Sequence, residues 1–513
     1  MEQPEVTTTG GRVRGVWRVF GAGPEDSASG TGYRSAAFLG IPYAEPPVGT
    51  LRFAAPQRHR RWDGVRNAVT QGPTPQRGDH GLTSIPEPSV PGTSTLNVNV
   101  FTPDPSPSAA LPVLVWIHGG GYLAGSPASP WYDGHAFNRD GVVVVSLSYR
   151  LGFEGFGWVE DSPGAGVANN RAIRDWLLAL EWVQENIRAF GGDPSRVTLA
   201  GQSAGGGAVL TLLGMPAAQA LFSGVWASSP AQSIVTLEKA GETSARLARL
   251  AGTEPTAPGL GSLPESRVRE LQRKAARGKK GPLTFIRSLV GGGLSFAPVL
   301  DGDLLTGTPK QSAETGTGGG KPLVLGCTDD EFSLLPERLA RLLERVPAGL
   351  ALRALGLRGS VRDYVGANTA LPGGSGTARL LGRFVTDNVF RAPALDLAEH
   401  RIGTAPTWLY RFAWESPVRK LSVHCLDVPF FFDCLDGGFP KTAGRPAIES
   451  LLGEKPPQAL ADALHGDAVS FATTGKVEWA PFQAPGRATA RCYDLPLAED
   501  TDAYASVRPL LHT

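Results

Sequence analysis

The sequence predicts an α/β fold with a central, mostly parallel and twisted sheet flanked by helices. Residues 111–117 (LPVLVWI) and 142–147 (VVVVSL) are continuous apolar runs, as expected of parallel strands covered on both faces. Apolar residues then recur at three- and four-residue spacing over 172–190, which indicates a helix that ends at Gly191. A further strand over 196–200 completes a strand–helix–strand unit.

The remaining texture predicts one domain with helical insertions. Residues 235–290 are typical of helices with charged outer faces and show no strand signal, and a second helical region is expected at about 333–400. Strands are expected at 322–326 and 407–413, with a last strand pair within 479–495. Residues 21–32 predict a hairpin loop, and 307–321 predict a polar loop rich in glycine and threonine. We therefore expect a single domain over 1–513, with the insertions forming a cap over the functional site.

Composition and charge exclude several classes of function. The chain has 513 residues with 49 basic and 48 acidic side chains, so no nucleic-acid footprint is expected. No segment approaches ~18 consecutive apolar residues, so no membrane span is expected. The first residues, MEQPEVTTTGGRVRG, have neither a basic nor an apolar leader segment, which predicts a cytoplasmic protein.

The cysteines predict neither a disulfide framework nor a zinc site. There are four in a long chain, and none forms a CxxC pair. We expect them to be small buried hydrophobic residues in a reducing compartment. Cys327 and Cys425 lie near the candidate acid and base described below, and the sequence leaves their accessibility open.

A serine sits in a motif typical of a nucleophile. Residues 201–205 (GQSAG) place Ser203 between a predicted strand and a predicted helix. Small residues permit a sharp turn there that exposes the serine oxygen, while the helix N-terminus faces developing negative charge. The motif alone is weak, but this strand–turn–helix context favours a nucleophilic serine.

A serine hydroxyl needs a base that removes its proton and an acid that orients the base. In this kind of fold the expected chain order is serine, acid, histidine. Four histidines follow Ser203: His400 in a polar segment, His465 in a helical stretch typical of a surface, His512 near the end, and His424. His424 is favoured because it stands where a turn meets the apolar run VPFFF.

The acid is expected at the end of a strand between these two residues. Residues 324–332 (VLGCTDDEF) leave a strand and present Asp329, Asp330 and Glu331 in succession. The pattern alone does not choose among the three, and a solvated acidic loop is the alternative.

A glycine run supplies the remaining part of such a site. Residues 116–122 (WIHGGGY) follow a core strand, so backbone N–H groups can point at a carbonyl oxygen. Losing one such donor typically costs about 3–4 kcal/mol of transition-state stabilisation. A glycine run followed ~80 residues later by a serine elbow matches the arrangement of esterases and lipases.

The chain as a whole resembles the type-B carboxylesterase/cholinesterase family of α/β-hydrolases, in particular its bacterial carboxylesterases. The resemblance rests on long motifs in the family's order: AFLGIPYAEPPVG at 37–49, LRF at 51–53, WDG at 62–64, SYRLG at 148–152, EWVQENI at 181–187, FGGDPSRVT at 190–198, FAPVLDG at 296–302 and TDNVF at 386–390.

The resemblance implies ester hydrolysis through an acyl-enzyme, with no metal and no cofactor, acting on a small-molecule ester. It assigns the nucleophile to Ser203, the acid to Glu331 at the end of an Asp-Glu pair, and the base to His424. It further assigns the oxyanion donors to Gly120, Gly121 and Ala204. Two supporting residues, Gln202 and Ser229, complete the set. A monomer or a weak homo-oligomer is expected.

Three positions depart from the family pattern. Thr95 stands where secreted members have a cysteine, so that disulfide cannot form. Residues 168–176 (ANNRAIRDW) replace a block that usually reads GNxGLxDQ, which affects local packing. Gln202 replaces the usual glutamate before the nucleophile, so we predict a preference for neutral esters.

Other functions stay open on the sequence. A specialised hydrolase of carbamates, amides or natural-product esters would use the same residues. A catalytically silent scaffold member of the family would lack a triad residue, whereas this chain has all three. A cholinesterase would need an aromatic gorge for its cationic substrate, which Trp131, Tyr132 and Trp158 alone do not establish.

Overall fold

The computed structural model describes residues 2–20, 32–76, 84–160, 166–276, 290–291, 294–337, 340–343, 345–368, 376–438, 441–484 and 488–511. Its strands are β1 Glu5–Thr7, β2 Arg12–Arg14, β3 Val16–Phe20, β4 Tyr33–Pro42, β5 Val65–Asn67, β6 Asn97–Thr102, β7 Leu111–Ile117, β8 Val143–Leu147, β9 Gly192–Gln202, β10 Gly224–Ser228, β11 Val235–Thr236, β12 Val299–Leu300, β13 Leu323–Thr328, β14 Thr407–Phe412, β15 Ala490–Tyr493 and β16 Ala498–Asp500.

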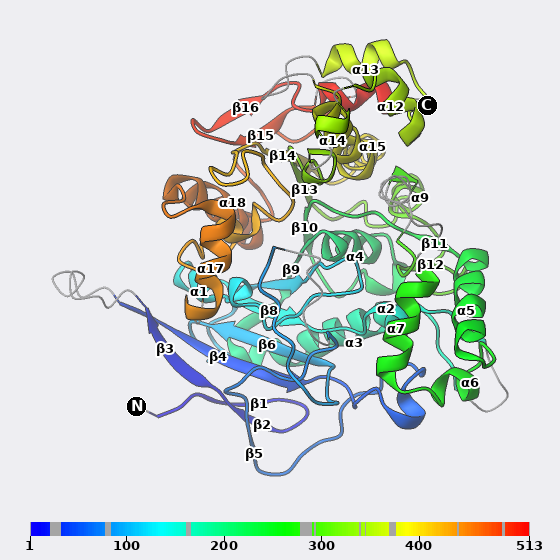
Figure 1. The fold of residues 1–513 in the computed structure, drawn as a ribbon. Coiled ribbons are helices and arrows are strands. Elements are labelled where there is room, and N and C mark those ends of the chain that lie inside the picture. The colour runs from blue at the N-terminus through cyan, green and yellow to red at the C-terminus, as the bar shows by residue number, and fades with distance from the viewer. Residues whose placement is uncertain are drawn as a thin grey trace.

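The helices lie between and after these strands (Figure 1). The α-helices are α1 His135–Arg139, α2 Gly152–Phe156, α3 Arg171–Asn186, α4 Ala204–Leu213, α5 Leu237–Ala251, α6 Ala257–Gly261, α7 Glu265–Ala276, α9 Pro309–Glu314, α10 Leu334–Glu337, α11 Ala340–Leu343, α12 Ala348–Leu355, α13 Val361–Ala367, α14 Thr377–Thr386, α15 Ala392–His400, α16 Val428–Phe431, α17 Lys441–Leu452 and α18 Gln458–Thr474. A π-helical turn, η6 Asp387–Arg391, joins α14 to α15. Short 3-10 turns are η2 Gly49–Leu51, η3 Pro130–Tyr132, η4 Ile187–Phe190, η5 Pro216–Ala218 and η7 Ala505–Leu510.

The central sheet has the predicted mixed but mostly parallel character. Within the described residues its order is β16-β15-β14-β13-β10-β9-β7-β8-β6-β4-β3. Every pair from β8 to β15 in this order is parallel, and the antiparallel pairs lie towards the two edges. The α/β prediction is therefore confirmed, including the parallel strands at 111–117 and 142–147.

Alternate side chains of β7 enter two different cores, which explains its continuous apolar sequence. Val113, Val115 and Ile117 join the cluster that contains Trp176 of α3. Leu114 and Trp116 point the other way, into a cluster with the aromatic residues of α16 and α18. A strand covered by helices on both faces gains from apolar residues at every position.

Helices occupy much of the two regions that were predicted to be helical. Helices α5, α6 and α7 lie within 237–276, and α10 to α15 lie within 334–400. The expectation of no strand in the first region is wrong at its start, because β11 pairs with β12 in parallel. Residues 277–289 of the first region lie outside the described residues.

Two other local predictions are corrected. Residues 307–321 are not a plain loop, because they contain α9. Thr308 caps this helix through the N–H of Gln311, the Gln311 side chain returns to the Thr308 N–H, and Pro309 occupies the first turn, so local capping outweighs the glycine content. The last strand pair is β15 and β16, so it begins later than predicted and extends past Leu495. The loop expected at 21–32 falls almost wholly outside the described residues.

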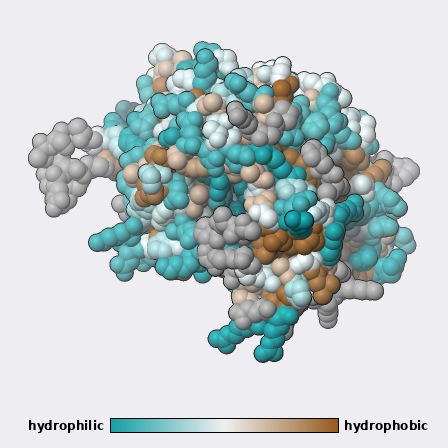
Figure 2. Space-filling model, turned by 90° about the horizontal axis from the view of Figure 1, so that it is seen from above, coloured by the Kyte–Doolittle hydropathy of each residue, from teal (hydrophilic) through white to brown (hydrophobic). Residues whose placement is uncertain are grey.

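The surface turned to the viewer in Figure 2 is mainly hydrophilic, with a limited hydrophobic area to the right of its centre. Large hydrophobic side chains that are strongly exposed, such as Leu350 at 66%, come from several separate elements. Among the described residues, no helix combines the length and apolar character needed to cross a membrane.

The junction between β9 and α4 is packed so tightly that only glycine fits at two positions. A Cβ on Gly201 would lie 2.5 Å from the carbonyl oxygen of Gly205. A Cβ on Gly205 would overlap the carbonyl oxygen of Ile117 at the end of β7. These contacts explain why the chain places glycines on both sides of Ser203.

We expect Gly205→Ala to destabilise the protein by about 1–3 kcal/mol, because the added methyl group collides with a backbone oxygen that cannot rotate away. Gly241→Ala is the matched control, since Gly241 lies in α5 and a Cβ there meets open space. The control should be neutral or gain about 0.5–1 kcal/mol from helix propensity. Urea-unfolding midpoints measure both, and equal midpoints for the two variants would contradict the packing argument.

Candidate active site

Ser203 stands at the apex of a strained turn between β9 and α4. Its backbone has φ 59° and ψ −122°, a conformation that non-glycine residues rarely adopt. The carbonyl oxygen of Ser203 accepts from the N–H groups of Gly207 and Ala231, both at 2.9 Å, and its N–H donates to Ser228 at 3.0 Å. Three backbone hydrogen bonds thus hold the strain in place.

Glu331 and His424 meet although they are far apart in the sequence. Glu331 lies in the turn after β13, where one carboxylate oxygen accepts from the N–H of Thr328 at 2.9 Å. The other oxygen is hydrogen-bonded to Nδ1 of His424. The His424 N–H also donates to the Glu331 carbonyl at 3.1 Å, so backbone and side chains pair in the same place.

Two aromatic rings confine the imidazole. The ring of His424 lies 5.0 Å from that of Phe332 and 5.2 Å from that of Phe390, centre to centre. Phe332 follows Glu331 directly, and Phe390 belongs to the π-helical turn η6. Sequence reasoning missed this confining role, although both residues stand in motifs that it used.

The surroundings make His424 a stronger base than a free imidazole. Burial opposes the charged form, yet the neighbouring Cys425 and Glu331 outweigh it and raise the pKa of His424 well above its ordinary value. Burial also raises the pKa of the Cys425 thiol, so at neutral pH this thiol is uncharged. The carboxylate of Glu331 is therefore the charge that acts on the imidazole.

Gln202 contacts the other ring nitrogen of His424. The side-chain nitrogen of Gln202 lies 3.2 Å from Nε2, and the whole residue is 1% exposed. With Nδ1–H directed at Glu331, Nε2 is free to accept this amide proton. The hydroxyl of Ser203 makes no hydrogen bond to His424 within the described structure, as is common before a substrate tightens such contacts.

The glycine turn lies directly against the serine. A Cβ on Gly119 would be 3.0 Å from Cβ of Ser203, which shows how closely the two segments approach. Gly120 and Gly121 have φ values of 104° and 60°, which favour glycine. The N–H groups of Gly120, Gly121 and Ala204 donate to no acceptor in the described part of the chain.

Several other polar groups close to Ser203, Glu331 and His424 are buried. Ser229 is fully buried in a left-handed conformation at φ 43°, and its hydroxyl has no hydrogen-bond partner among the described residues. Asp427 accepts from Tyr410 at 3.0 Å, and burial raises the pKa of its carboxyl to about 6. Cys327 and Cys425 are both buried, which answers the accessibility question left open by the sequence.

The other histidines considered lie elsewhere. His400 is half-buried on α15, where Nδ1 is hydrogen-bonded to the carbonyl of Asp396. The prediction of a surface position for His465 is wrong, because it is 2% exposed and its ring lies 4.4 Å from that of Phe137. His512 lies outside the described residues.

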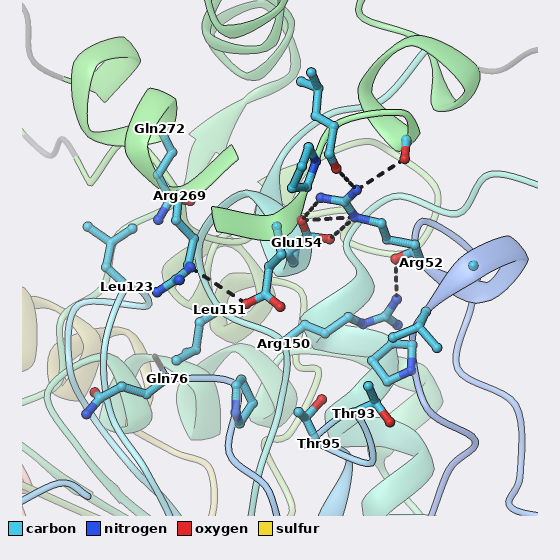
Figure 3. A pocket seen from close by; sticks show the side chains of 18 residues that line it. Arg52, Gln76, Thr93, Thr95, Leu123, Arg150, Leu151, Glu154, Arg269 and Gln272 are labelled. Carbon is cyan, nitrogen blue, oxygen red and sulfur yellow. Dashed lines mark hydrogen bonds and ion pairs between the residues drawn. The ribbon is translucent and has the colours of Figure 1, made fainter. Parts of the chain in front are cut away.

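A cavity of about 310 Å³ adjoins the glycine turn (Figure 3). Leu123 lines it from that turn, and neither Ser203 nor His424 does. Arg52 points along its wall and is paired with Glu154 at 2.7 Å, so this charge is already neutralised. Among the described residues, no group of three or more His, Cys, Asp or Glu side chains could hold a metal ion.

The sequence matches known proteins along most of its length. The model of the carboxylesterase family matches residues 2–346. The chain is 35% identical over 464 residues to para-nitrobenzyl esterase of Bacillus subtilis (strain 168), covering 88% of this chain and 89% of that protein. It is 31% identical over 467 residues to phenmedipham hydrolase of Pseudarthrobacter oxydans, covering 85% and 86%.

Solved structures agree. A para-nitrobenzyl esterase structure covers 100% of both chains with a TM-score of 0.79 at 30% identity. A carboxylesterase of Geobacillus stearothermophilus covers 98% of this chain and 99% of its own, with a TM-score of 0.79 at 28% identity. The chain therefore belongs to the carboxylesterase family, and it is an α/β-hydrolase that hydrolyses carboxylic esters.

Proposed function

We propose that Ser203, His424 and Glu331 form the catalytic triad of a serine carboxylesterase that acts through an acyl-enzyme. The observation that carries the proposal is the buried carboxylate–imidazole pair of Glu331 and His424, next to a serine on a strained turn. A carboxylate on Nδ1 sets the tautomer that leaves Nε2 free to take a proton.

In the first half-reaction Ser203 attacks the ester carbonyl while Nε2 of His424 removes the hydroxyl proton. Glu331 stabilises the imidazolium that results. The N–H groups of Gly120, Gly121 and Ala204 stabilise the oxyanion, because they point at no other acceptor and need no reorganisation. His424 then gives its proton to the leaving alcohol.

In the second half-reaction water replaces the alcohol. His424 removes a proton from this water, the hydroxide attacks the acyl-enzyme carbonyl, and the proton returns to Ser203 as the acid leaves. No residue in this cycle requires a metal or a cofactor. Gln202 must release Nε2 when the serine proton arrives. Ser229 remains the candidate for a supporting residue, because its buried hydroxyl has no partner among the described residues.

The substrates we propose are small neutral esters. An amide at Gln202 hydrogen-bonds without adding negative charge beside the imidazole, so nothing there selects for a cation. Trp131 and Tyr132, two of the aromatic residues considered for a gorge, are buried in the core, which argues against a cholinesterase. Relatives named for phenmedipham and for fumonisin B1 keep a specialised substrate as the second candidate.

We also propose a single-domain protein in the cytoplasm that is a monomer or a weak homo-oligomer. One sheet takes strands from β3 near the start of the chain to β16 near its end, which supports a single domain. All four cysteines are free, which is typical of a reducing compartment. Size-exclusion chromatography with light scattering tests the oligomeric state.

We expect Ser203→Ala to lower kcat on p-nitrophenyl esters by about 10⁶-fold, because no other hydroxyl replaces the nucleophile. A sulfonyl fluoride should label the wild-type enzyme once, at Ser203. Ser108→Ala, at an exposed position, is the control and should be indistinguishable from the wild type. Stoichiometric labelling at another serine would refute the assignment. An acyl-chain series of esters, with amide and carbamate analogues beside it, then ranks the two substrate candidates.

Gln202→Glu should move the acid limb of kcat/KM to higher pH. The base form of His424 is the active one, so activity rises as pH passes through its pKa. A second carboxylate near Nε2 favours the imidazolium, so the pKa of His424 rises and a higher pH is needed to deprotonate the ring. Gln57→Glu, which adds the same charge at an exposed position, should leave the limb in place. Superimposable profiles for Gln202→Glu and the wild type would sink this prediction.

A further inference from the structure

Helix α14 presents two buried arginines to the turn that carries Glu331. Arg379 and Arg383 stand one helical turn apart on α14, and they are 7% and 4% exposed. Nη1 of Arg379 lies 2.7 Å from a carboxylate oxygen of Asp330, and Nη2 donates to the other at 3.2 Å. Arg383 lies 3.9 Å from Asp329, the preceding residue.

Asp330 links α14 to the segment that carries His424. Its carboxylate accepts from the N–H of Ser422 at 3.2 Å, and its own N–H donates to the Ser422 carbonyl at 2.9 Å. The same two segments are joined next along the chain, where the His424 N–H meets the Glu331 carbonyl at 3.1 Å. The Asp330 side chain is thus shared between the arginine and the backbone beside the base.

We propose that Arg379 is a positioning residue for the reaction, which holds Asp330 so that the Glu331 carboxylate stays on Nδ1 of His424. This inference rests on the proposed triad. Arg379 touches neither the substrate nor the reacting atoms in the mechanism above. It acts through Asp330, which directly precedes Glu331 and is hydrogen-bonded to Ser422 in the facing segment.

Helix α14 packs against the turn closely enough for a change at Arg379 to alter the position of the turn. A Cβ on Gly382 would lie 2.7 Å from Oγ and 2.8 Å from Cα of Ser333, so the helix touches the turn directly. The hydroxyl of Ser333 donates to Asp330 at 3.3 Å. Helix, turn and carboxylate therefore form one packed unit.

Asp330 depends on Arg379 more than Asp329 depends on α14. Arg411 of β14 binds Asp329 through two donors, at 2.6 and 3.0 Å, and Arg383 is only the more distant partner. In the part of the chain that the structure describes, Arg379 is the one cation paired with Asp330. Removing Arg379 therefore leaves a carboxylate that is 2% exposed without a counter-charge, which it can relieve only by protonation or by moving towards water.

Either response loosens the link to Ser422 and shifts Glu331 relative to the imidazole. We expect Arg379→Gln to lower kcat by about 10- to 100-fold with little change in KM, because displacements of this kind affect the aligned transition state more than binding. Arg379→Lys keeps the charge but loses the two-pronged contact, so its kcat should fall between this variant and the wild type.

The acid limb of kcat/KM separates positioning from simple loss of stability. The charge that acts on the imidazole of His424 is the carboxylate of Glu331, because the buried thiol of Cys425 is uncharged at neutral pH. A carboxylate that drifts from Nδ1 stabilises the imidazolium less, so the limb should move to lower pH, in the same direction as in Glu331→Gln. Active enzyme is counted by sulfonyl fluoride titration, and the rates are measured well below the Tm of each variant.

Arg401→Lys is the matched control. Arg401 is 3% exposed and donates to Thr407 and to the carbonyls of Gly318 and Lys321, away from the turn of Glu331. This variant should lose thermal stability, keep kcat within about twofold of the wild type and leave the acid limb in place.

Each outcome decides the inference. Arg379→Lys and Arg379→Gln with wild-type kcat and acid limb would overturn it, and so would an equal fall of kcat in Arg401→Lys. Because Arg379→Gln can fail to fold, Arg379→Lys alone suffices for the comparison. If Glu331→Gln itself leaves kcat and the limb unchanged, the proposed triad is wrong; if Glu331→Gln acts as proposed and Arg379→Lys does not, only the inference about Arg379 fails.

Discussion

The candidate site depends on the hydrogen-bonded junction between the turn after β13 and the segment that follows β14. Glu331 and His424 are 93 residues apart, and they meet because the two parallel strands end at the same edge of the sheet. Backbone hydrogen bonds from Asp330 and His424 join the two segments before any side chain contributes. The carboxylate–imidazole contact is thus a consequence of strand order. Strand β9 is separated from β13 by β10 alone and runs parallel to it, so Ser203 comes to the same edge.

Burial of acidic side chains at this junction creates a demand for counter-charge. Asp329, Asp330 and Glu331 are all less than 10% exposed, and isolated carboxylates are costly in such surroundings. Arginines from β14 and α14 meet this demand for the two aspartates, while Glu331 is left for the imidazole. The helical region between 334 and 400 therefore does more than cover the sheet, since it neutralises the turn on which the proposed acid is carried.

Local patterns predicted the parts of the fold that obey local rules. The apolar runs of β7 and β8 and the three- to four-residue spacing of α3 need only burial to explain them, and they were predicted within a few residues. The pattern of small residues around Ser203 was also sufficient to predict the turn, because the contacts at Gly201 and Gly205 allow only glycine. By contrast, α9 was not predicted, because the residues around it are rich in glycine. His465 was predicted to lie at the surface, but it is on the buried face of its helix.

By itself the sequence determined the α/β architecture and the chemical kinds of group available: a serine on an elbow, an acidic turn, a histidine before an apolar run and a glycine turn. It also contained the family motifs that chose Glu331 among three adjacent acids. Only the tertiary structure decided which groups touch, including Gln202 on Nε2, the two phenylalanine rings around His424 and Arg379 on Asp330. The reason is physical: burial and spacing are encoded locally, whereas pairing of charges and hydrogen bonds between distant segments depends on where the sheet brings their ends together.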